Sequence, residues 1–245
     1  MSFKIFVAIA AAEGWFLHYI DIMTAFLYAE LKEPIEIELP EGQREEHPDQ
    51  IGLLMKTIYG LKQSPREWTN SLYVIVYIDD LLVLSSSEEE IQVFKDTVSK
   101  HFDTTDKGVL ERYLAINVFY KDNSIYLSQS DYIDKILTRF GLENCKPVHT
   151  PIDKKQALIP FDGTTTKLQI KEFQTKIGTL IWLMVSTRPD ISFVVIKLAR
   201  HTTNPSEAHF QALKRVFRYL TGSKYLAISF SRDTSQSLSG YCDAD

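Results

Sequence analysis

Residues 74–84 read Val74-Ile75-Val76-Tyr77-Ile78-Asp79-Asp80-Leu81-Leu82-Val83-Leu84. Two apolar runs, each long enough for a strand, flank the short segment Ile78-Asp79-Asp80, which carries two adjacent carboxylates. This pattern predicts a tight β-hairpin with Asp79 and Asp80 at its tip. The stretch Ser87–Glu90 has the form of a capping box and is followed by apolar residues at helical spacing, so a helix of about fifteen residues should come next.

A second strand is expected on the N-terminal side of this hairpin, over residues 16–20, and it ends at Asp21. If that strand pairs beside the hairpin, Asp21, Asp79 and Asp80 converge on one point. Three carboxylates without a counter-charge repel one another, so the arrangement makes sense when Mg²⁺ lies between them. Such ions would serve phosphoryl transfer. Ordinary turn and helix-capping roles for these aspartates are the alternative.

The rest of the chain predicts one more hairpin and then mainly helices. Residues 113–120 and 125–128 flank a polar turn at 121–124, and a helix that ends at Gly141 should follow. Prolines from Pro147 onward indicate a linker, and apolar residues at helical spacing return after it. The sequence therefore predicts an α+β fold.

Composition gives divided signals about the partners of the protein. The 245 residues are 44% hydrophobic and 24% charged, which is enough for a buried core. A net charge of −5 argues against a general nucleic-acid binder. Residues 197–218 nevertheless form a local basic stretch, with Glu207 as its one acidic residue. The longest apolar runs fall short of the ~20 residues that span a bilayer, so no membrane partner is expected.

Five blocks, in order along the chain, resemble the reverse transcriptase of Ty/copia-type LTR retrotransposons. Tyr77-Ile78-Asp79-Asp80-Leu81-Leu82 resembles the Tyr-x-Asp-Asp hairpin, and Asp21-Ile22-Met23-Thr24-Ala25-Phe26-Leu27 resembles the first aspartate motif. Ile58-Tyr59-Gly60-Leu61-Lys62-Gln63-Ser64-Pro65-Arg66-Glu67-Trp68 is similar to the template and nucleotide-contacting motif. Thr187-Arg188-Pro189-Asp190-Ile191 and Lys214-Arg215-Val216-Phe217-Arg218-Tyr219-Leu220 resemble the downstream region.

The resemblance implies catalytic and nucleotide-binding roles. Asp21, Asp79 and Asp80 match the catalytic ligands of two Mg²⁺ ions, for which Mn²⁺ could substitute. The residues that match nucleotide contacts are Phe26, Lys62, Gln63 and Arg66, the two cations being suited to phosphate. An ordinary core position is the alternative for Phe26, and solvated surface charge is the alternative for Lys62 and Arg66.

The resemblance also implies contacts with primer and template, at Tyr77, Leu114, Lys214, Arg215 and Arg218. Leu114-Ala115-Ile116 matches the primer-gripping hairpin, with Ala115 in place of the usual glycine, which should hinder close backbone approach to the primer. Residues 240–245 resemble the start of an RNase H domain, in which Asp243 matches the first catalytic carboxylate. No RNA cleavage is expected from this chain alone.

The spacing after Trp68 departs from the family pattern. Several tens of residues normally separate this tryptophan from the Tyr-x-Asp-Asp hairpin, whereas here Thr69–Val76 must suffice. At ~1.5 Å per helical residue this segment cannot form a palm helix and also return to the sheet. The resemblance therefore implies a reduced polymerase palm, a ferredoxin-like antiparallel sheet with helices, followed by a mainly helical thumb or connection region.

The expected parts are partial fingers and palm (1–104), hairpin and helix (105–145), linker (146–168), helical connection (169–235) and the start of a truncated RNase H domain (236–245). Their implied function is Mg²⁺-dependent DNA synthesis with an RNA template, a DNA primer and dNTPs, in a cytoplasmic particle or in the nucleus, with other Pol-derived chains as further partners. The alternative is a catalytically inactive remnant that at most binds nucleic acid or a partner polymerase chain. An unrelated metal-dependent phosphodiesterase has only the carboxylates in its favour.

Overall fold

The computed structural model describes residues 2–23, 30–37, 52–56, 72–153 and 158–232. Within these ranges the chain combines helices with antiparallel sheets, which confirms the predicted α+β class. It divides into two compact units, a first unit of residues 1–110 with 231–245 and a second unit of residues 111–230. Among the described helices, none has the length and apolar character needed to cross a membrane.

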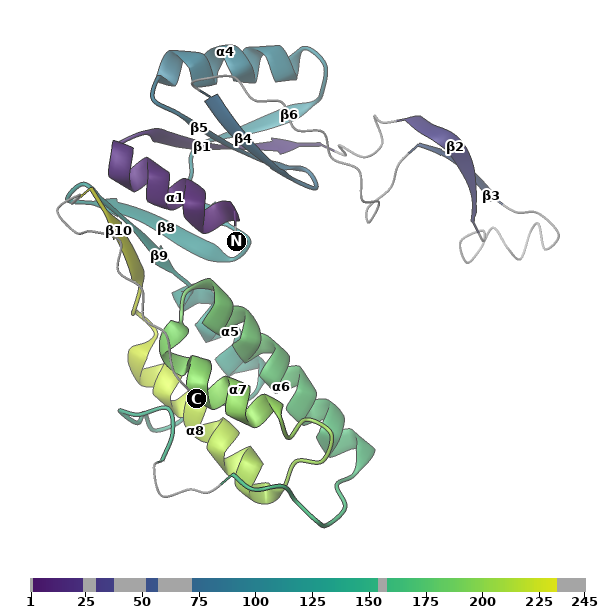
Figure 1. The fold of residues 1–245 in the computed structure, drawn as a ribbon, viewed down its shortest axis with the longest axis vertical. Coiled ribbons are helices and arrows are strands. Elements are labelled where there is room, and N and C mark those ends of the chain that lie inside the picture. Colours follow the sequence, from purple (N-terminus) through teal and green to yellow (C-terminus); the bar gives the residue numbers. More distant parts are fainter. Residues whose placement is uncertain (1, 24–29, 38–51, 57–71, 154–157, 233–245) are drawn as a thin grey trace, which may run out of the picture. The chain divides into compact units, whose positions relative to one another are not determined.

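The first unit is built on an antiparallel sheet with the strand order β4-β5-β1-β6. Its strands are β1 (Phe16–Ile22), β4 (Leu72–Tyr77), β5 (Asp80–Ser85) and β6 (Thr104–Val109). Helices α1 (Ser2–Glu13) and α4 (Glu88–Ser99) lie on opposite sides of this sheet (Figure 1). A separate two-stranded sheet holds β2 (Glu30–Ile37) and β3 (Gly52–Lys56). The predicted hairpin is confirmed, and so is the predicted strand over 16–20, which continues through Asp21 to Ile22.

Helix α4 covers one face of this sheet. Its N-cap is Ser87, whose hydroxyl oxygen accepts a hydrogen bond from the Glu90 backbone N–H at 3.3 Å. Ile91 of α4 packs on Ile20 of β1 and Val83 of β5, and all three are buried. Because side chains alternate along a strand, the strand neighbours of Ile20 and Val83 point to the other face of the sheet.

The second unit combines a sheet with a helical core. The sheet has the order β10-β9-β8-β7 and consists of β7 (Arg112–Tyr113), β8 (Ile116–Lys121), β9 (Ser124–Ser128) and β10 (Ile228–Ser231). The helices are α5 (Ser130–Arg139), α6 (Lys167–Ser186), the short 3₁₀ helix η1 (Pro189–Ile191), α7 (Ser192–Ala199) and α8 (Glu207–Ser223). The second predicted hairpin corresponds to β8–β9. The single strand predicted over 113–120 is wrong, because a two-residue turn at Leu114 and Ala115 divides it into β7 and β8. The predicted helix before Gly141 is α5.

One continuous hydrophobic cluster joins helices α5 to α8. Phe173, Val195 and Phe217 are fully buried in it, and Ile133 of α5 belongs to the same cluster. The core of the second unit thus runs across the predicted linker at 146–168. The names palm, thumb, connection and RNase H for parts of the chain stay predictions, as do their boundaries, and residues 236–245 lie outside the described residues.

A buried arginine fastens the end of α6 to α8. The Arg188 side chain is 1% exposed and donates to both carboxylate oxygens of Asp190, at 2.9 and 2.7 Å. It also donates to the Ser223 carbonyl at 3.1 Å, while the Tyr219 hydroxyl donates to Asp190 at 2.8 Å. Burial would raise the pKa of Asp190, but the bonds from Arg188 outweigh it and hold that pKa below its usual value. The block at 187–191 is therefore a structural clamp.

Candidate active site

The sheet of the first unit brings two of the predicted catalytic carboxylates together. Asp21 of β1 lies directly opposite Asp80 of β5. The Ile22 backbone N–H donates to the Asp79 carbonyl at 2.7 Å, which makes Asp21 and Asp80 a non-hydrogen-bonded pair. In pairs of this kind the facing side chains approach each other most closely. Asp79 adjoins the pair from the hairpin tip.

The carboxylate pair lies on the face of the sheet that α4 does not cover. Ile20 and Ile22 point toward α4, so Tyr19 and Asp21 point the other way. The Tyr19 hydroxyl donates to Asp80 Oδ1 at 2.5 Å, across the two strands. The Asp21 side chain is 36% exposed, and solvent can therefore reach this site.

The hairpin tip that carries Asp79 is strained. Only Ile78 and Asp79 connect the paired residues Tyr77 and Asp80, and Ile78 has a φ of +58°. A positive φ at the first turn position is the type II′ pattern, which favours glycine there, and β-branched residues rarely adopt it. Such a conformation costs on the order of 1–3 kcal/mol and is found mainly at functional sites.

The donor set suits a hard divalent cation, although the structure assembles only part of it. Carboxylate oxygens are the ligands that Mg²⁺ prefers, and Asp21 and Asp80 present them from adjacent strands. Among the described residues, no group of three His, Cys, Asp or Glu side chains is arranged to hold a metal ion. The pair can therefore offer ligands from two residues, with Asp79 next to them.

The predicted primer and template residues fall into three places. Tyr77 is opposite Asp80 in β4 and is half-exposed, at 48%. Leu114 is at the β7–β8 turn, where Leu114 and Ala115 have φ values of +45° and +62°. The position at which the resemblance expects a glycine thus has a backbone conformation that favours glycine.

The basic residues of α8 are partly engaged within the second unit. Arg215 donates from Nη2 to the Thr150 hydroxyl at 2.9 Å and from Nε to the Thr150 carbonyl at 3.2 Å. Arg218 donates from Nε to the Lys146 carbonyl at 2.7 Å. Both arginines thus hold the segment 146–150 against α8. Lys214 instead lines a cavity of about 220 Å³ together with Lys176 and Glu207.

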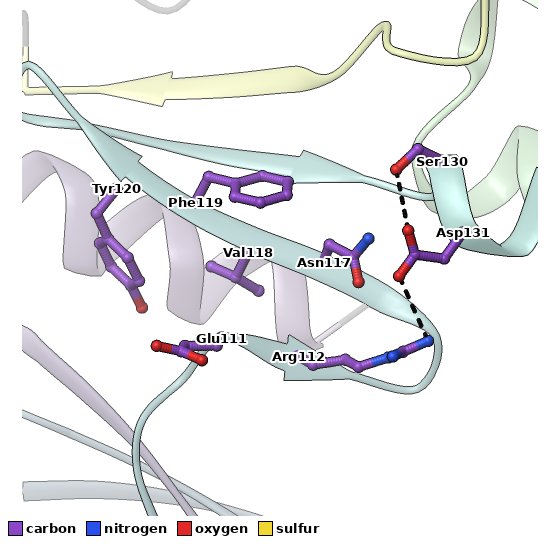
Figure 2. Close-up of a pocket in the computed structure, with 8 residues that line it drawn as sticks. All are labelled: Glu111, Arg112, Asn117, Val118, Phe119, Tyr120, Ser130 and Asp131. Atoms are coloured by element: carbon purple, nitrogen blue, oxygen red, sulfur yellow. Dashed lines mark hydrogen bonds and ion pairs between the residues drawn. The ribbon is translucent and has the colours of Figure 1, made fainter.

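Sequence reasoning missed a cavity of about 670 Å³ beside the β7–β8 turn (Figure 2). Its lining residues are Glu111, Arg112, Asn117, Val118, Phe119, Tyr120, Ser130 and Asp131. Arg112 and Asp131 form an ion pair across it at 3.8 Å. Burial, with a smaller contribution from the charge of Glu111, raises the pKa of Tyr120 to about 12. The adjacent aromatics Phe119 and Tyr120 in a predicted strand were the one available signal.

The remaining predicted site residues lie outside the described residues. They are Phe26, Lys62, Gln63 and Arg66 of the expected nucleotide site, and Asp243 of the expected RNase H start. Their roles stay predictions from the sequence.

Comparison with known proteins places the chain in a family. Residues 1–75 and 69–154 match the family model described as reverse transcriptase (RNA-dependent DNA polymerase). The chain belongs to this reverse transcriptase family. The Ty/copia resemblance seen in the sequence agrees with that result, since similar proteins include Pol polyproteins from transposons.

Three reverse transcriptase relatives illustrate the similarity. The retrovirus-related Pol polyprotein from transposon TNT 1-94 of Nicotiana tabacum is 29% identical, over 100% of this chain and 21% of its own length. The corresponding polyprotein from transposon RE1 of Arabidopsis thaliana is 30% identical, over 100% and 18%. A transposon Ty5-1 protein of Saccharomyces cerevisiae is 29% identical, over 91% and 82%. The chain thus spans about a fifth of the length of the two plant polyproteins.

The reverse transcriptase match is interrupted where the sequence predicted missing residues. It falls into two pieces that overlap at residues 69–75. The similarity to the tobacco polyprotein extends over 282 residues, whereas this chain has 245. The two-piece family match agrees with a shortened segment between Trp68 and Tyr77.

Proposed function

We propose that this chain is the reverse transcriptase segment of a Ty/copia-type retrotransposon and that Asp21, Asp79 and Asp80 are its catalytic residues. The observation that supports this most directly is the pairing of Asp21 with Asp80, next to a strained tip that carries Asp79. The partners would be an RNA template, a DNA primer and dNTPs, with other Pol-derived chains, in a cytoplasmic particle or in the nucleus.

The position of each residue in the fold indicates its proposed role. Asp21 and Asp80 would bind two Mg²⁺ or Mn²⁺ ions, which activate the primer hydroxyl and stabilise the leaving pyrophosphate when bound. The Tyr19 hydroxyl orients Asp80 through its 2.5 Å bond. Tyr77, on the same face as Asp80, would support the primer end. Leu114, at the β7–β8 turn, would contact the primer.

Primer extension with the purified chain tests this function. Soluble, monodisperse protein should incorporate dNTPs on a primed RNA template only when Mg²⁺ or Mn²⁺ is added. Asp80→Asn should reduce incorporation by about 100-fold or more, since even outer-shell partners of a metal cost 10–100-fold. Asp122→Asn is the matched control, because Asp122 also lies at a hairpin tip but belongs to the β8–β9 turn. No incorporation by the unaltered chain would refute polymerase activity.

A catalytically inactive remnant is the second candidate, and the interrupted family match supports it. Such a chain would keep the fold and bind a primer–template duplex without extending it. Binding that weakens as salt concentration rises is expected, because cations that contact phosphates release counterions. Absent or salt-insensitive binding, measured by fluorescence anisotropy, would contradict duplex binding by such a remnant.

A further inference from the structure

The carboxylate pair already has two partners within this chain. Like charges directly opposite each other in a sheet are destabilising, and Asp21 faces Asp80 in this way. Asp80 accepts a hydrogen bond from Tyr19, a neutral donor. Asp21 has a cationic partner, because Lys107 Nζ lies 3.7 Å from its Oδ2. The cation relieves the repulsion that the strand register creates.

The backbone of β6 explains why Lys107 lies beside Asp21. Thr105 of β6 is directly opposite Asp21, so Lys107, two residues further on, is its diagonal neighbour on the same face. Asp106 points to the opposite face, where Lys95 of α4 lies 2.9 Å from its carboxylate. The position of Lys107 therefore follows from strand alternation as well as from the side-chain geometry.

A local irregularity interrupts the pairing of β6 with β1 just after Lys107, and the pairing resumes at Val109 and His18. The register between β1 and β6 shifts between His18 and Ile20, and Gly108 has a φ of +73°. The Gly108 backbone N–H donates to Asp106 Oδ1 at 2.8 Å, which fixes this bend. Lys107 thus lies within β6, two residues from Thr105, the partner of Asp21, and directly before the irregularity at Gly108.

We infer that Lys107 is the internal counter-cation of the Asp21–Asp80 pair and that a divalent ion must displace it from Asp21. The displacement step rests on the proposed function, which supplies the metal ion. The counter-cation role of Lys107 stands without it. The two side chains are 43% and 36% exposed, so the ion pair is weak enough for displacement. Lys107 therefore lowers the affinity of this site for Mg²⁺ while it stabilises the metal-free sheet.

Direct binding of Mn²⁺, followed by the electron paramagnetic resonance signal of the free ion, tests the competition. Lys107→Met keeps the aliphatic stem and removes the charge. It should lower the dissociation constant for Mn²⁺ by about twofold to fivefold, the range that exposed ion pairs support. Lys121→Met is the control, because Lys121 makes an exposed pair with Asp122 in the second unit. An unchanged or higher dissociation constant in Lys107→Met would overturn the competition.

Thermal unfolding without metal tests the counter-cation role separately. Lys107→Met should lower the melting temperature of the unaltered chain, but should not lower that of a chain that already carries Asp21→Asn. Equal effects in the two backgrounds would overturn the inference. Coupling between the two positions, together with no Mn²⁺ binding by any variant, would refute the proposed metal site and retain Lys107 as the counter-cation.

Discussion

Among the described residues, three two-residue hairpin turns differ in how well their residue types suit their backbone conformation. The β8–β9 turn holds Asp122 and Asn123 at φ values of +49° and +57°, and these residue types tolerate the left-handed region because their side chains bond locally. The β4–β5 turn places Ile78 at +58°, and the β7–β8 turn places Leu114 and Ala115 at +45° and +62°. Each turn has two residues, yet one is relaxed and two are strained.

The strained tips are those to which the sequence assigned functions. Ile78 precedes Asp79, a proposed catalytic residue, and Leu114 is the proposed primer contact. The relaxed tip carries no proposed role. Strain of this kind persists only where the surrounding structure imposes it, and here the paired strands on both sides impose it. The strained β4–β5 and β7–β8 turns therefore place residues with proposed roles, whereas the relaxed β8–β9 turn serves only the stability of its hairpin.

The largest expected effect concerns the register on which this comparison rests. Because a two-residue turn makes Tyr77 and Asp80 a hydrogen-bonded pair, the Ile75 N–H points to β5 and the Val76 N–H points away from it. Ile75→Pro should destabilise the first unit by about 2–4 kcal/mol, through a lost ladder bond and an unpaired acceptor. Val76→Pro, on the edge strand, should cost much less. Urea unfolding followed by circular dichroism measures both, and equal losses would contradict the register.

The double substitution Leu114→Asn with Ala115→Gly should give the largest gain. The left-handed conformation costs Leu and Ala roughly 1–2 kcal/mol each, whereas Asn and Gly tolerate it, so the second unit should gain about 2 kcal/mol of unfolding free energy. The measurement is the urea midpoint. A loss of stability would show that contacts of the Leu114 side chain matter more than backbone strain.

Ile78→Gly should separate stability from activity. Removal of a β-branched residue from a positive φ should stabilise the first unit by about 1 kcal/mol, after the larger entropy of glycine in the unfolded chain is subtracted. Primer extension should fall, because a freer tip positions Asp79 less well. If extension rises together with stability, the strain has no role in catalysis.

Asn123→Gly should have the smallest effect. Asparagine already tolerates the left-handed region, so the change should stay within about 0.5 kcal/mol. The same urea titration serves as the reference for the two strained turns. A gain as large as that at residues 114 and 115 would remove the distinction between relaxed and strained tips.

Local patterns were sufficient to predict the parts of the site that follow from short-range order. Two apolar runs around adjacent carboxylates predicted the β4–β5 hairpin and its Asp79–Asp80 tip, and the Ser87 cap marked the start of α4. A missing glycine drew attention to Ala115, whose φ is indeed positive. Each of these signals lies within a few residues of the feature that it predicts.

Long-range register was beyond the reach of the sequence. Lys107 comes 86 positions after Asp21, and only the pairing of β1 with β6 makes them neighbours. In the same way, the charges of Arg215 and Arg218 indicated a basic surface, whereas both side chains bond the backbone of residues 146–150. A charge pattern in the sequence indicates which ligands a surface could bind, but the tertiary structure determines which charged side chains are already bonded within the protein.

The clamp around Arg188 shows that a sequence motif can identify a protein family through a structural role alone. Its motif resembles a reverse transcriptase block, yet the guanidinium is enclosed by Asp190 and Ser223 and cannot touch a nucleic acid in this fold. Its contacts serve the fold of the second unit, whether or not the chain copies nucleic acid. A buried position of this kind identifies the family without reporting on activity, whereas the proposed catalysis depends on Asp21, Asp79 and Asp80.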